Sequence, residues 1–227
     1  MKKKKCHLGI DLGGTNLKGG LVNTKGRIFA KYAYPIDANK GGKAILKQLM
    51  GFIHEISHDA ALKGIQIKGI GIGTPGAVDF QKGCVGYGAG NLPGWKGVPF
   101  IKIIQKDFRI PVFAHNDATL AALAEARFGM GKDKKNIICV TLGTGIGGGV
   151  IIDGKVYHGR SAYAGEIGHM KIVPDGRACT CGARGCWEAY ASATGVVNMA
   201  KEYSQKRKSS QLYKKYHKHW KRMGAKE

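Results

Sequence analysis

The sequence predicts an α/β protein of two related domains that face each other across a cleft. Apolar strands alternate with amphipathic helices from the start of the chain to about residue 157. Two Gly-rich turns, DLGGTN at 11–16 and TLGTGIGGG at 141–149, each stand between two expected strands and form a weak internal repeat. The 227 residues allow two modest domains, and 43% hydrophobic residues suffice for packed cores.

The first domain is expected over residues 1–116. Short apolar runs bounded by Gly, Asn or Pro predict its strands, and apolar side chains at helical spacing predict its helices. The expected elements are strands at 6–12, 17–22, 27–34, 65–73 and 110–114, and helices at 43–62 and 98–107.

The second domain is expected over residues 117–205. It begins with an alanine-rich helix that Asn116 and Asp117 open and Gly129 ends. A strand at 136–142 follows, and then a hairpin at 146–157 with the turn-forming pair Asp153–Gly154 at its tip.

The formal net charge of +22 first suggests a nucleic-acid partner, but its distribution does not. Residues 201–227 hold ten Lys or Arg against two acids, residues 2–5 are lysines, and the remaining charge forms no stripe. We therefore expect solvated basic ends and no nucleic-acid partner. Periodicity is lost after Tyr203, so residues 206–227 are expected to be a basic tail outside the core.

The sequence predicts a cytoplasmic protein without membrane contact. No run of about eighteen apolar residues occurs, and Asp11 interrupts the apolar stretch that follows the first lysines. Clustered cysteines in the cytoplasm indicate metal ligands before disulfides. The sequence leaves the oligomeric state open, with a homodimer as one option.

The two Gly-rich turns are candidate phosphate sites. Backbone N–H groups of Gly13 and Gly14 can approach phosphate oxygens without a clashing Cβ, and Asp11 could hold Mg²⁺ through water. The second turn has five glycines within 143–149, a cost in chain entropy that a nucleotide against bare backbone would offset. The alternatives are an ordinary hairpin turn and a loose loop. Neither turn is a Walker A motif, because no Gly-Lys-Ser/Thr follows.

Asn116 and Asp117 stand where a strand ends and a helix begins. The positive end of a helix dipole favours an ionised carboxylate, which can accept the proton of a sugar hydroxyl during phosphoryl transfer. The alternative for Asp117 is a plain helix cap.

A histidine and three cysteines have the spacing H-x9-C-x-C-x4-C. His169, Cys179, Cys181 and Cys186 supply one imidazole and three thiols, a set that suits tetrahedral Zn²⁺. Four protein ligands fill the coordination shell, so this zinc would be structural. The alternatives are three buried free cysteines and a zinc-finger module, but no base-reading helix follows at the usual spacing.

Together these segments resemble the ROK family of sugar kinases and repressors, whose members have the actin-like ATPase (ribonuclease H-like) fold. The resemblance runs from about Leu8 to Met199. Its pieces occur in family order as DLGGTN, GIGTPGAVD, GNLPGW, NDA, LGTGIGGG, GEIGHM and CTCGARGCWE. The glucokinase branch fits best, on NLPGW and GEIGH.

The resemblance implies ATP-dependent phosphorylation of a hexose, with glucose 6-phosphate as the expected product. It makes Asp117 the catalytic base and implies that His169 binds zinc through one ring nitrogen and sugar through the other. The implied hexose ligands are Gly76, Asn91, Asn116, Asp117, Glu166, His169 and Glu188. The implied ATP and Mg²⁺ residues are Asp11, Gly13, Gly14, Thr15, Asn16, Thr144 and Gly145.

Family kinases are longer than this chain, and residues 206–227 resemble nothing in the family. We therefore expect an incomplete second domain and a tail that is either native or the product of a shifted reading frame. Two alternatives follow: an impaired, truncated ROK protein that binds sugar and zinc, or a sugar-responsive regulator. The regulator is disfavoured, because no helix-turn-helix domain precedes the first Gly-rich turn.

Overall fold

The structure, a computed structural model, describes residues 4–88, 90 and 92–225. The chain divides into two compact units, Met1–Leu120 with Arg127–Lys132, and Ala121–Ala126 with Asp133–Glu227. The division falls within helix α3, which spans Asp117–Phe128.

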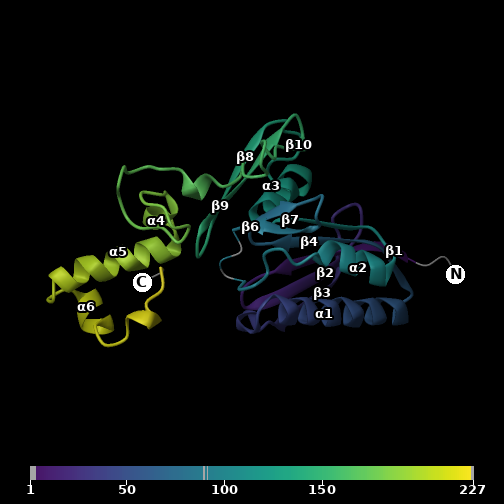
Figure 1. The fold of residues 1–227 in the computed structure, drawn as a ribbon, viewed down its shortest axis with the longest axis horizontal. Helices are drawn as coiled ribbons and strands as arrows, with labels where there is room; N and C mark the ends of the chain where they lie inside the picture. Colours follow the sequence, from purple (N-terminus) through teal and green to yellow (C-terminus); the bar gives the residue numbers. More distant parts are fainter. Residues whose placement is uncertain (1–3, 89, 91, 226–227) are drawn as a thin grey trace. The chain divides into compact units, whose positions relative to one another are not determined.

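The first unit is built on a five-stranded mixed sheet in the order β3-β2-β1-β4-β7 (Figure 1). Strands β1, β2 and β3 form an antiparallel meander, whereas β4 and β7 run parallel to β1. The strands are β1 (Lys4–Leu12), β2 (Asn16–Val22), β3 (Ile28–Pro35), β4 (Ile65–Thr74) and β7 (Val112–Asn116). All five expected strands of this domain are therefore present.

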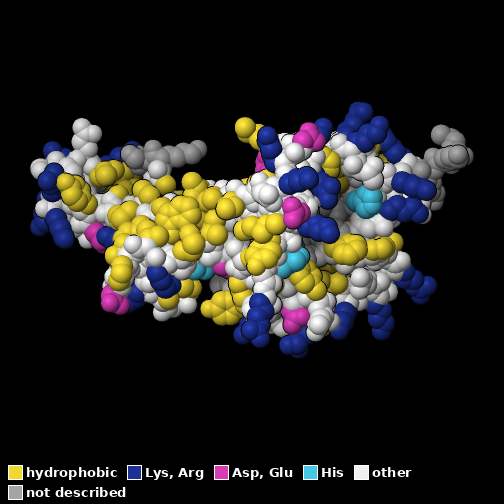
Figure 2. All heavy atoms as spheres, turned by 90° about the horizontal axis from the view of Figure 1, so that it is seen from above, with side chains coloured by type: hydrophobic (Ala, Val, Ile, Leu, Met, Phe, Trp, Pro, Cys, Tyr) yellow, Lys and Arg dark blue, Asp and Glu magenta, His cyan; other side chains and the backbone are white. Residues whose placement is uncertain are grey.

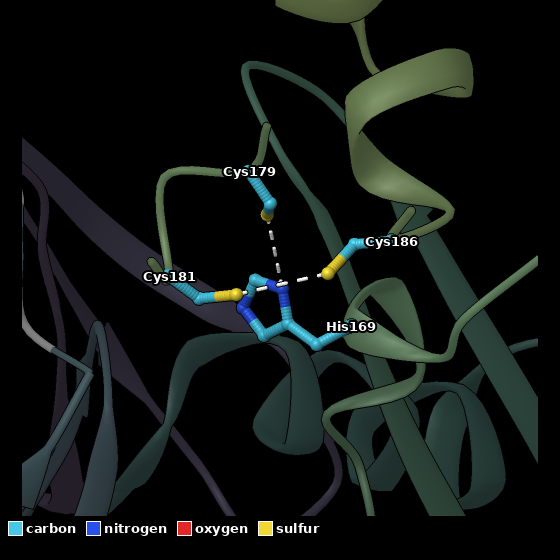
Figure 3. Close-up of side chains that lie close together, drawn as sticks. All are labelled: His169, Cys179, Cys181 and Cys186. Carbon is cyan, nitrogen blue, oxygen red and sulfur yellow. Dashed lines mark hydrogen bonds between the residues drawn. The ribbon is translucent and has the colours of Figure 1, made fainter. Parts of the chain in front are cut away.

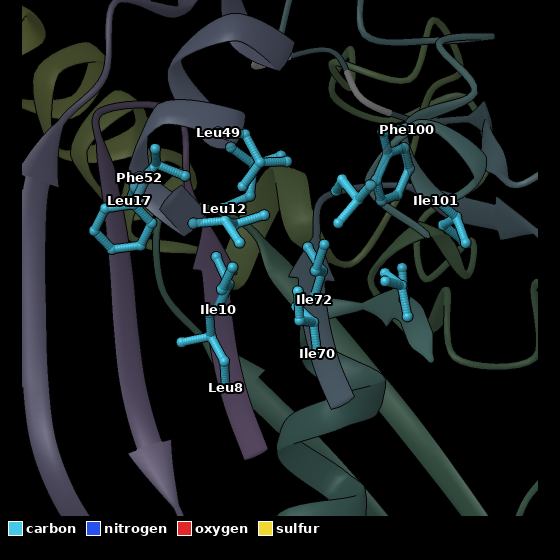
Figure 4. Close-up of a cluster of buried hydrophobic side chains, with 14 of the residues drawn as sticks. Leu8, Ile10, Leu12, Leu17, Leu49, Phe52, Ile70, Ile72, Phe100 and Ile101 are labelled. Carbon is cyan, nitrogen blue, oxygen red and sulfur yellow. The ribbon is translucent and has the colours of Figure 1, made fainter. Parts of the chain in front are cut away.

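Helices α1 (Gly42–Leu62) and α2 (Phe100–Phe108) supply the apolar side chains that cover one face of this sheet. Alternate side chains of β1, among them Leu8 and Ile10, are buried in one cluster with Leu49 and Phe52 of α1 (Figure 4). A Cβ at Gly19 would lie 2.9 Å from the Ile56 side chain, so helix and sheet are closely packed at this position. Both helices were predicted from their spacing.

A short hairpin of β5 (Ala77–Asp79) and β6 (Cys84–Tyr87) adjoins this sheet and was not predicted. Gly76 begins it with φ at +88°, and a Cβ there would lie 2.4 Å from the Tyr87 carbonyl oxygen. The buried Trp95 indole donates to the Thr74 hydroxyl at 3.1 Å. These contacts fix the chain just beyond the carboxyl end of β4.

The second unit contains a three-stranded antiparallel sheet and a helical part. Its sheet has the order β10-β9-β8, with Asp153 and Gly154 in the turn between β9 and β10. Both turn residues have positive φ, as the two-residue hairpin turn predicted there requires. The elements are β8 (Ile137–Leu142), β9 (Ile146–Ile152), β10 (Lys155–Val156), η2 (Ile167–His169), α4 (Glu188–Ala191), α5 (Ala193–Lys206), α6 (Gln211–Tyr216) and η3 (Trp220–Arg222).

Within the segment 206–225, expected to be part of a basic tail, the structure places the helix α6 and the short helical turn η3. Helix α6 begins after Ser210, whose hydroxyl accepts from the Tyr213 N–H at 3.2 Å, and η3 follows. Tyr216 and Met223 are buried, and α6 packs against α5. A side-chain cap and a few buried anchors therefore order a segment whose many lysines hide any apolar periodicity.

Among the described residues, no helix combines the length and the apolar character that crossing a bilayer requires.

Candidate functional site

The first Gly-rich turn joins β1 to β2. The Gly13 N–H donates to the Asn16 carbonyl at 3.0 Å, and a Cβ at Gly13 would lie 3.1 Å from that oxygen, so the turn is tight. The Asn16 amide donates to the Thr15 hydroxyl at 3.1 Å, and both side chains are exposed. The turn therefore presents polar side chains and nearly bare backbone at the edge of the sheet, as a phosphate site requires.

Four predicted site residues meet at the carboxyl ends of β1, β4 and β7, which run parallel. Asn116 ends β7 and caps α3, since its side-chain oxygen accepts from the Thr119 N–H at 3.1 Å. Its amide nitrogen donates to the Gly76 carbonyl at 3.4 Å. The helix cap is thus Asn116, which leaves Asp117 as the first residue of α3.

Asp11 and Asp117 are electrostatic neighbours at this edge. Burial raises the pKa of the Asp11 carboxyl, the positive charge of Lys18 opposes this rise, and the negative charge of Asp117 adds a smaller increase. Lys18 lies directly across the β1–β2 pairing, with its Nζ 3.9 Å from an Asp11 oxygen. Two carboxylates that interact electrostatically beside a candidate phosphate-binding turn are suited to hold a cation and to accept a proton.

The second Gly-rich turn, between β8 and β9, is held by residues from α4 and α5 of the same unit. The Ile146 N–H donates to Glu188 Oε2 at 2.9 Å, and the Thr194 hydroxyl donates to the Thr144 carbonyl at 2.8 Å. A Cβ at Gly145 would lie 2.3 Å from Glu188 Oε2, so no other residue fits there without displacing the carboxylate. Tertiary contacts therefore fix this turn, and the loose-loop alternative does not describe it.

The four predicted metal ligands converge in the second unit (Figure 3). Their ligand atoms all lie within 4.8 Å of one another. Cys179 Sγ is 3.6 Å from His169 Nδ1, and Cys181 Sγ is 3.7 Å from Cys186 Sγ. A tetrahedral zinc with sulfur at about 2.3 Å needs sulfurs about 3.8 Å apart, so the donor set and its spacing fit zinc.

The cysteine pKa values depend on burial and on Lys171. Burial raises the pKa of the Cys179 thiol to about 11, so a metal would have to displace its proton. Burial also acts to raise the pKa of Cys186, but hydrogen bonds, first from Lys171 and then from the other thiols, outweigh it and lower the pKa. The hydrogen bond from Lys171 therefore makes the Cys186 thiol easier to ionise.

The hexose residues predicted in the second unit adjoin this cluster. His169 directs Nδ1 to Cys179, while its Nε2 lies 3.8 Å from a Glu166 oxygen. Glu188 Oε1 accepts from the Thr180 hydroxyl at 3.1 Å and lies 3.8 Å from Cys179 Sγ. The cluster thus links the Glu166–His169 turn to the carboxylate that holds the second Gly-rich turn.

The predicted residues fall into one group in each unit, apart from Asn91, which lies outside the described residues. The sequence reasoning missed Lys171, Thr180 and Thr194, which contact the cluster or the second Gly-rich turn. Only Thr194 had a local signal in the sequence, because it lies two residues after a helix-capping serine. Ser192 caps α5, and its hydroxyl accepts from the Gly195 N–H.

Comparison with known proteins gives a consistent result. The sequence pattern of the ROK family matches residues 7–222. A glucokinase of Halalkalibacterium halodurans is 37% identical over 94% of this chain and 64% of its own length. The xylose repressor of Bacillus spizizenii is 36% identical over 86% of this chain and 50% of its own.

A solved structure gives the same fold. A ROK family glucokinase from Streptomyces griseus, in complex with glucose and AMPPNP, superimposes with a TM-score of 0.75 at 35% identity. The match covers 91% of this chain and 64% of that one, so the chain spans just under two thirds of these glucokinases.

These findings define the class of protein: a mixed α/β chain with the actin-like ATPase fold. The chain belongs to the ROK family. The family match reaches residue 222, so the expectation that residues 206–227 resemble nothing in the family was wrong for most of that segment.

Proposed function

We propose that this chain takes part in the ATP-dependent phosphorylation of a hexose, with glucose as the substrate. The observation that carries the proposal is that Asp11 and Asp117 both lie at the carboxyl ends of the parallel strands β1 and β7, beside the first Gly-rich turn. The glucokinase relatives and the complex of one of them with glucose and AMPPNP support it.

In the proposed reaction, Asp117 is the catalytic base. Its carboxylate accepts the proton of a sugar hydroxyl while that oxygen forms a bond to the γ-phosphorus and the bond from phosphorus to the ADP oxygen breaks. Gly76 and Asn116 are the proposed sugar ligands of the first unit, and Glu166, His169 and Glu188 are those of the second. Each Gly-rich turn is proposed to bind phosphate oxygens.

Two metals belong to this proposal. Asp11 would hold Mg²⁺ through water, and when bound this ion would neutralise phosphate charge. His169, Cys179, Cys181 and Cys186 would hold a structural Zn²⁺ that orients the His169 ring toward the sugar. The free cysteines and the proposed substrates fit a cytoplasmic location.

The catalytic base is tested by Asp117→Asn. We expect glucose affinity to persist and turnover in a coupled assay with Mg-ATP to fall by about 10² to 10⁴, because only proton acceptance is removed. Asp133→Asn, an exposed carboxyl outside the site, is the control. Unchanged turnover in Asp117→Asn would rule out this role, and a wild-type chain that neither binds glucose nor phosphorylates it would overturn the proposed function.

The metal site is tested by elemental analysis of the purified chain. We expect zinc near one equivalent and its loss in Cys181→Ala, because three ligands hold zinc far less well than four. Cys139→Ala, a cysteine of β8 outside the cluster, should keep the metal. A wild-type chain free of zinc and able to fold would contradict the site.

A further inference from the structure

Lys171 is held beside the metal cluster by the backbone. The Ile172 N–H donates to the Gly185 carbonyl and the Trp187 N–H to the Met170 carbonyl, both at 2.9 Å. These bonds place Lys171 directly opposite Cys186 in a short antiparallel bridge. Paired residues between two such bonds have their side chains close together on the same side, so the register itself brings Lys171 to the thiol.

The Lys171 ammonium contacts two of the four ligand residues. Its Nζ donates to Cys186 Sγ at 2.9 Å and to the His169 carbonyl at 3.3 Å. The other two basic residues of the segment 170–187 are directed elsewhere: Arg177 pairs with Glu202, and Arg184 donates to the Asp175 carbonyl. Lys171 is therefore the basic side chain of this segment that faces the cluster.

The net charge expected for the zinc-bound cluster makes an ammonium at this position favourable. Three thiolates carry three negative charges, and a Zn²⁺ ion neutralises two of them. The remaining negative charge lies partly on Cys186, which is fully buried, and a buried charge without a partner is costly. An ammonium in hydrogen-bond contact with that sulfur offsets the charge.

We propose that Lys171 is a positioning residue of the metal site, whose ammonium balances the three-thiolate cluster and retains zinc in it. This inference rests on the metal site proposed above. It also gives a reason for the residue type, because a neutral side chain opposite Cys186 would leave the zinc–thiolate group with a net negative charge.

The test compares zinc release from the full chain in four variants. Lys171→Met keeps the length of the stem and removes the charge, whereas Lys171→Arg keeps the charge. Lys171→Gln is a second neutral variant in case Lys171→Met folds poorly. Lys155→Met, at an exposed position of β10 in the same unit, controls for the general loss of a lysine. Transfer of zinc to a chromogenic chelator gives the rate.

We expect Lys171→Met and Lys171→Gln to release zinc about 10-fold faster than wild type, because the loss of an outer-shell partner typically weakens metal binding by about 10-fold or more. Lys171→Arg and Lys155→Met should stay close to wild type. Cobalt-substituted Lys171→Met should still show thiolate-to-metal absorption, which separates faster release from loss of a ligand.

Two outcomes overturn the inference while leaving the proposed metal site intact. Equal release rates in wild type and in the neutral Lys171 variants would show that the ammonium does not retain the metal. Faster release in Lys171→Arg as well, matching Lys171→Met, would show that charge is not the cause. A wild-type chain without zinc would instead overturn the metal site itself, and this inference with it.

Discussion

At the scale of single residues, the second Gly-rich turn shows how one side chain can serve two parts of the site. Glu188 holds the Ile146 N–H with one carboxylate oxygen and the Thr180 hydroxyl with the other. The proposed phosphate turn and the loop 170–187 that carries Cys179, Cys181 and Cys186, the cysteine loop, are therefore joined through one carboxylate. The sequence identified both Gly145 and Glu188, but their contact spans 43 residues and could not be predicted from local pattern.

A substitution at Gly145 tests this contact. In Gly145→Ala the new Cβ would lie 2.3 Å from Glu188 Oε2, so the carboxylate must move and release the Ile146 N–H. We expect a loss of about 1–3 kcal/mol in the free energy of unfolding, as for other overpacked sites, and weaker binding of an ATP analogue. Calorimetry and titration measure the two effects.

Gly143→Ala is the matched control for this change. A Cβ at Gly143 would meet nothing within 4 Å, although Gly143 belongs to the same turn. Equal stability and nucleotide affinity in the two variants would show that Glu188 does not set the shape of the turn.

At the scale of elements, a salt bridge ties the cysteine loop to α5. The Arg177 guanidinium binds the Glu202 carboxylate through two hydrogen bonds of 2.7 Å, and the Arg177 backbone N–H donates to the Tyr190 hydroxyl. The hydrogen bonds from Arg177 lower the pKa of Glu202 below its ordinary value of 4.5. A two-bond Arg–carboxylate pair fixes geometry as well as charge.

Glu202→Gln should therefore have a pH-dependent effect. A carboxyl whose pKa is lower in the folded state stabilises it above the unfolded pKa, and this contribution is lost as pH falls through the folded pKa. We expect a lower melting temperature than wild type at pH 7 and a difference that shrinks in acid below pH 4.5. Thermal unfolding followed by circular dichroism at several pH values gives the comparison.

Asp175→Asn, an exposed carboxyl in the same loop, is the control for this experiment. Its positive φ suits Asn as well as Asp, so backbone strain does not change. If the melting temperature of Glu202→Gln is lower than that of wild type by the same amount at every pH, ionisation of Glu202 does not contribute to stability in the predicted way.

Elements with a strong periodic pattern were predictable, and those fixed by tertiary contacts were not. The spacing predicted α1 and the dipeptide Asp153–Gly154 predicted the second hairpin turn. Helix α5 was missed, because Thr, Gly, Val and Asn near its start are poor helix formers and its stability comes from a cap and from packing. The convergence of the metal ligands followed from spacing alone, whereas Lys171 entered the cluster through a register that only the fold reveals.

At the scale of the whole molecule, we expect strand β8 to govern solution behaviour, because it is an edge of the three-stranded sheet of the second unit. It lies at the end of the order β10-β9-β8 and its sequence, IICVTL, has no charged residue. Ile138 is 71% exposed and Leu142 is 69% exposed, and hydrophobic side chains also gather on the surface of the second unit (Figure 2). An exposed apolar edge is a template for pairing with another chain.

We therefore expect the 227-residue chain to self-associate as its concentration rises, despite its net charge of +22. The double variant Ile138→Lys, Leu142→Lys should stay monomeric at concentrations where wild type forms larger species, because charges on an edge strand oppose pairing. Both side chains are already exposed, so melting temperature should change little. Light scattering after size-exclusion chromatography measures the mass.

The control for this prediction is Ile28→Lys, since Ile28 is 50% exposed on β3, the edge strand of the first unit. Strand β3 already carries Lys31 and ends at Pro35, two features that protect a sheet edge. A further charge there should leave association unchanged. If Ile28→Lys reduces association as much as the β8 variant does, general charge repulsion is responsible and β8 is not the associating edge. If the β8 variant associates as wild type does, the contact lies on another surface, such as the groove along α5 lined by Val196, Tyr203 and Leu212.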